Sequence, residues 1–152
     1  MNISHQDQQI LQRLQHNCRQ PIAEIGEQIG MSTSACHRRI KQLEKTGVIA
    51  GYTAQIDAHK LGYNIDILVE ISLSSQSEHS LQDFEKAIEQ KPEILECHLM
   101  AGEADYILRM TAKDLQHYAQ LHRDVILCLP GVARVKSNIV LRSVKRSRGF
   151  TV

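Results

Sequence analysis

The side chains best suited to chemistry lie on one face of a helix that we predict from residue 33 to about residue 46. This face carries hydrogen-bond donors and cations and no acidic residue: Thr33, Ser34, His37, Arg38, Lys41 and Gln42. Such groups can donate to phosphate oxygens and to base edges in the major groove of DNA. We add Ser32, the expected N-cap, and Arg39, which lies at the edge of the face within reach of phosphate. The alternative is an ordinary helical hairpin with a solvated basic face.

The residues around this face favour a helix-turn-helix. Two apolar sets recur at helical spacing on either side of Gly30: Ile22, Ile25 and Ile29 before it, and Cys36, Ile40 and Leu43 after it. Glycine is the residue that most often follows a helix, so Gly30 predicts a tight turn between two short helices. The second of these helices is the one that would enter the major groove.

Two further elements complete the predicted DNA-binding domain. Ser4 and Asp7 form the start of an earlier helix, whose apolar positions are Ile10, Leu11 and Leu14. Apolar residues around Gly51, over residues 48–56, predict a small β-hairpin, or wing. We therefore expect a winged helix-turn-helix domain over residues 1–50, with the wing and a linker over residues 51–63.

The remainder of the chain, residues 64–152, alternates between strand and helix patterns. Apolar and polar residues alternate over 65–73, 95–99, 106–110 and 132–144, and helical spacing recurs over 81–88 and 115–129. The order β-α-β-β-α-β predicts an α+β, ferredoxin-like domain with helices on one face of the sheet. The other face would carry Leu68, His98, Ile107 and Val140, which we expect to be too apolar to stay wet. At least a homodimer, joined through this second domain, would cover it.

The loop between the second and third predicted strands is a candidate ligand site. It comprises Met100, Ala101, Gly102, Glu103, Ala104, Asp105 and Tyr106. Gly102 permits a positive φ and close backbone approach, free N–H groups could bind a carboxylate, and Asp105 could bind an ammonium group. These features together suit the polar end of an amino acid. The alternative is an ordinary hairpin in which Asp105 caps its own turn.

Composition limits the class of protein. The chain has 152 residues, 42% of them hydrophobic and 23% charged, which suits a soluble protein of two small domains. No apolar run approaches the roughly 20 residues that span a bilayer, and the polar N-terminus lacks a signal peptide pattern, so we expect a cytoplasmic location and no membrane partner. The four cysteines, Cys18, Cys36, Cys97 and Cys128, form no CxxC pair and are expected to be reduced and mostly buried.

Charge is distributed unevenly along the chain. Residues 1–60 have a net charge of +2, residues 61–133 of −7 and residues 134–152 of +6, with no acid in the last segment. Basic ends around an acidic middle suit a protein whose ends approach a polyanion. A solvated strand and tail would explain the basic C-terminal segment equally well.

An enzymatic function is not expected. His117 and His122 are five residues apart and His98 adjoins Cys97, but no third ligand lies at metal-binding spacing. No serine or cysteine lies in a motif that pairs a nucleophile with a base. We therefore expect no catalytic residue, no bound metal and no cofactor.

The ordered motifs of the whole chain resemble the Lrp/AsnC (leucine-responsive, feast/famine) family of transcriptional regulators. They are Asp7-x-x-Ile10-Leu11, Ile29-Gly30-Met31-Ser32, Arg39-Ile40-x-x-Leu43-Glu44-x-x-Gly47-Val48-Ile49-x-Gly51-Tyr52, Gly102-x-x-Asp105-Tyr106, Leu129-Pro130-Gly131-Val132 and Val144-Lys145. The resemblance implies dimers paired through their sheets, often assembled to octamers, with an amino acid or related small molecule bound near Gly102 and Asp105. Ala104 departs from the larger residue of many members, and the tail is more basic than the family pattern suggests.

Together these features predict a sequence-specific transcriptional regulator that binds double-stranded DNA. An effector, expected to be an amino acid, would bind at the 100–106 loop and change the oligomeric state and DNA occupancy. The alternative is an architectural, nucleoid-type DNA-binding protein that does not respond to small molecules.

Overall fold

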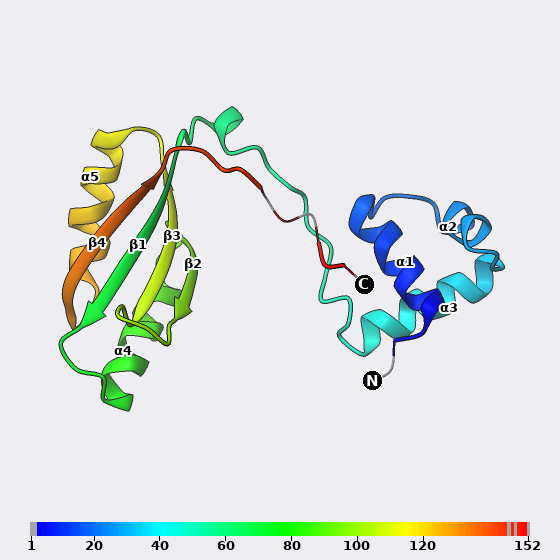
Figure 1. Cartoon of the computed structure of the whole chain (residues 1–152), viewed down its shortest axis with the longest axis horizontal. Coiled ribbons are helices and arrows are strands. Elements are labelled where there is room, and N and C mark those ends of the chain that lie inside the picture. The colour runs from blue at the N-terminus through cyan, green and yellow to red at the C-terminus, as the bar shows by residue number, and fades with distance from the viewer. Residues whose placement is uncertain (1–2, 146, 148, 152) are drawn as a thin grey trace. The chain divides into compact units, whose positions relative to one another are not determined.

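The computed structural model describes residues 3–145, 147 and 149–151 and divides the chain into two compact units. Unit 1 comprises residues 1–55 and 144–152, and unit 2 comprises residues 56–143 (Figure 1). Each unit has its own hydrophobic core. The first unit precedes the second along the chain, and the C-terminal tail groups with the first unit.

Unit 1 contains three helices, α1 (His5–His16), α2 (Ile22–Gln28) and α3 (Thr33–Lys45). Ser4 and Asp7 form the capping box that begins α1, as the S-x-x-D pattern predicts. The core draws buried side chains from all three helices: Ile10, Leu11, Leu14, Ile25, Cys36, Ile40 and Leu43. The apolar stripes identified in the sequence thus pack against one another and hold α3 with its opposite face exposed.

Two glycines shape the turn between α2 and α3. Gly30 has a φ of 69°, the left-handed conformation that glycine adopts without strain. Gly26 lies against the turn, because a Cβ atom added there would be 2.7 Å from the carbonyl oxygen of Met31. The N–H group of Met31 donates to the Gly26 carbonyl at 2.8 Å, which draws the two backbones together. The sequence patterns predicted the role of Gly30 but not that of Gly26.

The prediction of a β-hairpin wing over residues 48–56 is wrong. Residues 46–58 form no helix or strand. Val48 and Ile49 instead pack against the core of unit 1, and the Ile49 N–H donates to the Leu43 carbonyl at 3.1 Å. The apolar residues that suggested a hairpin are therefore partly used to close the end of α3, and Ile56 is left exposed.

Unit 2 begins with a short 3-10 helix, η1 (His59–Leu61), and contains four strands and two α-helices. In chain order these are β1 (Ile65–Leu73), α4 (Glu78–Glu89), β2 (Ile94–Leu99), β3 (Tyr106–Ala112), α5 (Leu115–Asp124), the 3-10 helix η2 (Ile126–Cys128) and β4 (Val132–Val140). The strands are ordered β2-β3-β1-β4, and all neighbours are antiparallel. This confirms the predicted ferredoxin-like arrangement.

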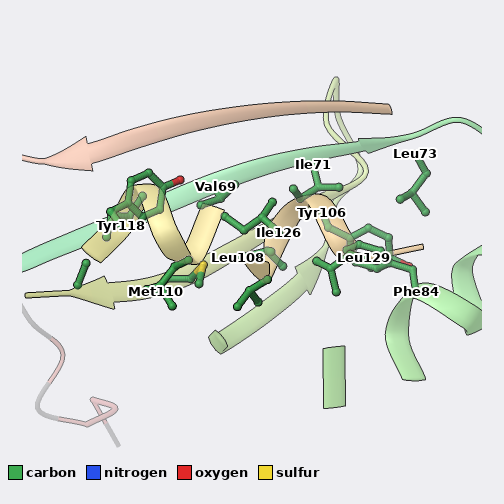
Figure 2. Close-up of a cluster of buried hydrophobic side chains, with 14 residues drawn as sticks. Val69, Ile71, Leu73, Phe84, Tyr106, Leu108, Met110, Tyr118, Ile126 and Leu129 are labelled. Carbon is green, nitrogen blue, oxygen red and sulfur yellow. The ribbon is translucent and has the colours of Figure 1, made fainter. Parts of the chain in front are cut away.

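The core of unit 2 lies on one face of this sheet, as Figure 2 shows. Alternate residues of β1 and β3 are buried there, among them Val69, Ile71 and Leu108, because successive side chains of a strand point to opposite faces. Phe84 of α4 packs against Tyr106 of β3 with ring centroids 4.5 Å apart. Both α-helices contribute to this cluster, so the opposite face of the sheet carries no helix from unit 2.

Two predicted elements end earlier than their sequence patterns suggest. The helix predicted over 115–129 stops at Asp124, and the tighter turn of η2 follows, after which Ile126 and Leu129 are both buried. The strand predicted over 132–144 stops at Val140, which pairs with Asp66 near the start of β1. Because β1 begins at Ile65, it offers almost no further residue to pair with β4 beyond Val140, and the β1–β4 pairing ends there.

Candidate functional site

The donor and cation face of α3 is exposed as predicted. Thr33, Ser34, His37, Arg38, Lys41 and Gln42 all have exposed side chains. Ser32 is the N-cap, and its hydroxyl accepts a hydrogen bond from the N–H group of Ala35 at 3.3 Å. The helix start is therefore fixed by Ser32, while the exposed side chains that follow it form a surface able to meet phosphates and bases.

An acidic side chain lies at the edge of this face. Lys41 donates to one carboxylate oxygen of Glu44 at 2.9 Å, and the Tyr52 hydroxyl donates to the other at 3.0 Å. The hydrogen bonds from Lys41 and Tyr52 lower the pKa of Glu44, while burial and the Glu44 carboxylate raise the pKa of Tyr52 to about 12. Lys41 thus has an anionic neighbour one helical turn away, whereas no ion pair involving Arg38 occurs within the described residues.

Arg39 is directed toward α1. Its guanidinium donates to an Asp7 carboxylate oxygen at 2.9 Å and to the Ser4 hydroxyl at 3.1 Å. The Arg39 side chain is 35% exposed and the Asp7 side chain only 15%. Arg39 lies at the edge of the face, but its guanidinium binds the capping box of α1.

The Asp7 carboxylate is held as an anion by these contacts. Burial, the largest single effect, raises its pKa, but hydrogen bonds from Ser4 and Arg39 and the Arg39 charge together lower the pKa below its ordinary value of 3.8. The Ser4 hydroxyl donates to the other Asp7 oxygen at 2.5 Å. The cluster Ser4–Asp7–Arg39 therefore joins the N-terminus of α1 to the middle of α3.

The candidate effector loop, residues 100–105, connects β2 to β3. The Met100 N–H donates to the Asp105 carbonyl at 2.8 Å, and Asp105 accepts through its side chain from the Leu73 N–H and the Gln76 amide, both at 2.7 Å. Asp105 thus ties this loop to the end of β1 and to the segment that follows it. Both carboxylate oxygens already have a partner in the chain.

The remaining loop residues differ in their exposure. Met100, Ala101, Gly102 and Glu103 are exposed, and Glu103 lies 3.6 Å from the Arg134 guanidinium. Gly102 is not among the glycines with a positive φ, so the expected left-handed conformation is absent, although the space around its Cα is open.

Tyr106 lies apart from this exposed surface. Its side chain is buried in the core, and its hydroxyl donates to Glu85 at 2.8 Å. Burial, followed by the Glu85 interaction, raises the pKa of Tyr106.

The open face of the sheet is more polar than expected. The strand register places Leu68, His98, Ile107 and Val140 there, as predicted, with Leu68 40% exposed. The same face carries ion pairs: Arg109 with Glu96 at 2.6 Å and with Asp66 at 3.9 Å, and Lys136 with Glu70 at 3.3 Å. Apolar contact alone therefore does not describe this face, because its charges are matched within the chain.

The other predicted features concern cysteines, metals and membranes. All four cysteines are free, but Cys18 and Cys128 are exposed, so the expectation of mostly buried thiols holds only for Cys36 and in part for Cys97. Among the described residues, no three metal-ligating side chains come together and no helix is long and apolar enough to cross a bilayer.

Comparison with protein families assigns both units. Residues 3–44 match the AsnC-type helix-turn-helix domain, and residues 66–150 match the Lrp/AsnC ligand binding domain. The leucine-responsive regulatory protein of Escherichia coli strain K12 is 34% identical over 146 residues, which cover 96% of this chain and 89% of that protein. An uncharacterized HTH-type transcriptional regulator of Sinorhizobium fredii is 41% identical over 80% of this chain and 95% of its own.

Two similar structures contain an amino acid. A transcriptional regulator of Neisseria meningitidis, in complex with L-Met, is 29% identical with a TM-score of 0.90, covering 96% of this chain and 94% of its own. The feast or famine regulatory protein of Mycobacterium tuberculosis, complexed with L-methionine, is 25% identical with a TM-score of 0.90, covering 99% of this chain and 100% of its own.

The contacts of Asp7 predict a pH-dependent stability. Because its pKa is lowered in the folded protein, Asp7 stabilises the fold above its ordinary pKa of 3.8, and this contribution is lost as pH falls through the lower folded value. Asp7→Asn should lower the free energy of unfolding by about 1–2 kcal/mol at pH 7. Urea unfolding of both proteins at pH 7 and at pH 3 would measure this, with a smaller difference expected at pH 3. Asp57→Asn is the control, and an equal difference at both pH values would contradict the assignment.

Proposed function

The chain belongs to the Lrp/AsnC family of transcriptional regulators, and from this premise we propose how it reads DNA and responds to an effector. The protein is a DNA-binding regulator with an amino-acid-binding domain of the Lrp/AsnC type. The observation that carries the DNA-binding part of the proposal is the exposed cationic face of α3, fixed by the core on one side and by Arg39 at its edge.

We propose that α3 enters the major groove. Arg38 and Lys41 contact phosphates, while Thr33, Ser34, His37 and Gln42 are available for phosphates or base edges. Ser32 supports this face as the N-cap, and Arg39 acts on it by positioning α3 against α1. Two such helices in a dimer would read successive major grooves, so we expect the binding site to be an imperfect palindrome.

We propose that an amino acid binds at the 100–105 loop and shifts the equilibrium between assembly states. The methionine complexes of two similar proteins support the ligand class. The Asp105 carboxylate is the candidate partner for the ammonium group, and the exposed backbone from Met100 to Glu103 is the candidate partner for the carboxylate. The ligand can act only through a difference in affinity between the two states.

We propose a homodimer joined through the open face of the sheet, assembling further to an octamer. Leu68, Ile107 and Val140 supply apolar area on this face, and the ion pairs of Arg109 and Lys136 supply polarity. We propose that the protein acts in the cytoplasm. The proposal includes no catalytic residue, cofactor or membrane partner.

One observation favours the architectural alternative. Both Asp105 carboxylate oxygens have hydrogen-bond partners inside the chain, so this residue is useful to the fold even without an effector. A ligand-independent DNA-binding protein would use the same α3 face. The response to amino acids distinguishes the two functions.

Replacement of Arg38 tests the DNA face. Arg38→Ala should weaken binding to duplex DNA several-fold and lower the slope of log affinity against log salt by about 0.9, the value for one phosphate contact. Fluorescence anisotropy over a salt series would measure both quantities. Arg123→Ala removes an equal charge from an exposed side chain of α5 in unit 2 and serves as the control. An Arg38 variant that behaves like this control would contradict the assignment.

Thermal unfolding in the presence of each amino acid, L-Met first, tests the effector site. A ligand at a hundred times its dissociation constant should stabilise the bound protein by about 2.7 kcal/mol and raise the unfolding midpoint. Asp105→Ala should abolish this shift. Gln76→Ala removes one of the two internal hydrogen bonds of Asp105 but keeps the carboxylate, so it should retain the shift. A normal shift in Asp105→Ala would exclude the ammonium contact, and no shift with any amino acid would support the architectural alternative.

A charge placed on the open face tests the dimer. Leu68 is 40% exposed on the open face, and Leu68→Lys would bury an unpaired charge in the proposed interface, so it should reduce the sedimentation mass toward that of the monomer. Leu127→Lys, at a residue that is 55% exposed on η2, is the matched control. An unchanged mass for the Leu68 variant in analytical ultracentrifugation would place the dimer interface elsewhere.

A further inference from the structure

The last nine residues carry charge that the proposed function does not use. This segment, residues 144–152, contains Lys145, Arg146 and Arg148 and no acidic residue. Although it follows β4 of unit 2 in sequence, it groups with unit 1, the helix-turn-helix unit. We call this segment the C-terminal arm.

One side chain of α1 holds the arm by its backbone. The Gln15 amide group donates to the Phe150 carbonyl at 3.1 Å, and the Gln15 carbonyl oxygen accepts from the Phe150 N–H at 2.5 Å. A single amide thus satisfies both backbone groups of one residue, as a neighbouring strand would. These contacts join neutral groups, so they neutralise none of the positive charge of the arm.

Gly149 lets the arm approach Gln15. Its φ of 127° lies in a region that favours glycine, and a Cβ atom there would overlap the Gln15 side-chain oxygen. Ser147 supports the same turn, because its hydroxyl accepts from the Gly149 N–H and donates to the Gly149 carbonyl, both at 3.3 Å. The local sequence therefore fits the contact with α1.

The stretch of chain around Gln15 is itself basic. Between Asp7 and Glu24 the chain has no acidic residue and contains Arg13, His16 and Arg19. No ion pair joins the arm to α1 among the residues that the structure describes. Cations held near other cations repel one another, and a bound polyanion offsets this repulsion. A unit of this size has a radius of gyration of about 11 Å and is therefore about 28 Å across, so a docked arm lies within roughly 30 Å of any duplex bound by α3.

From these observations we propose that the C-terminal arm is part of the DNA-binding surface, docked on α1 through Gln15 so that its cations meet phosphates outside the contacts of α3. The arm would add affinity that is independent of base sequence. This proposal rests on the proposed DNA binding by unit 1.

Three kinds of variant separate charge from docking. A Lys145→Gln, Arg146→Gln, Arg148→Gln triple variant removes the charge of the arm, while Gln15→Ala and Gly149→Ala release the arm with its charge intact. The control is Lys86→Gln, Lys91→Gln, Lys113→Gln, which makes the same change in net charge within unit 2. Each full-length protein would first be checked to have the thermal unfolding midpoint of the wild type. It would then be titrated against a duplex of arbitrary sequence over a salt series.

The triple variant of the arm should bind more weakly and lower the salt slope by about 2–3, while the control triple variant keeps the wild-type slope. Gln15→Ala and Gly149→Ala should each lower the affinity for the duplex and the salt slope by a smaller amount. An arm variant equal to the control overturns the proposal, and so do docking variants equal to the wild type, because the tail would then act without docking. If Arg38→Ala also leaves binding unchanged, it is the DNA-binding proposal itself that fails.

Discussion

The contact between Arg39 and the Ser4–Asp7 capping box is the interaction on which the DNA-binding unit depends. Unit 1 has a small core, and three short helices of this size are marginal without further links. One guanidinium joins the start of α1 to the middle of α3, with the Asp7 side chain only 15% exposed. Adjacent helical residues point about 100° apart, so Arg39 can hold α1 while Arg38 faces solvent. Of these two adjacent arginines, Arg39 therefore stabilises the fold and Arg38 is available to contact DNA.

In unit 2, the corresponding constraint is the sheet with helices on one face only. Its open face combines apolar side chains with the ion pairs of Arg109 and Lys136, all matched within one chain. Burying paired charges gains little affinity, because desolvation offsets much of their attraction. Such pairs do penalise misaligned partners, since a shifted sheet would bring like charges together. In the proposed dimer, the apolar residues would then supply affinity and the ion pairs would select the register.

Periodicity in the sequence predicted the helices of unit 1, the order of elements in unit 2 and the buried faces of β1 and β3, because these depend on local patterns. The failures depend on contacts that are distant in sequence. The wing lacks a partner strand, β4 stops where β1 begins, and Asp7, more than thirty residues away in the chain, directs Arg39 inward. Likewise, the bonds of Asp105 to the segment after β1, and of Gln15 to Phe150, leave no periodic signal.

In the proposed function, an effector bound to unit 2 changes the DNA binding of unit 1. Each unit packs its own core, and residues 46–58 form no helix or strand. Assembly offers a simpler route. Two DNA-binding units joined in one particle raise the effective concentration of the second for its half-site, which can strengthen binding by 10²–10⁴ without any new contact. An effector that changes how many units are joined would therefore change DNA occupancy while every α3 helix keeps the same structure.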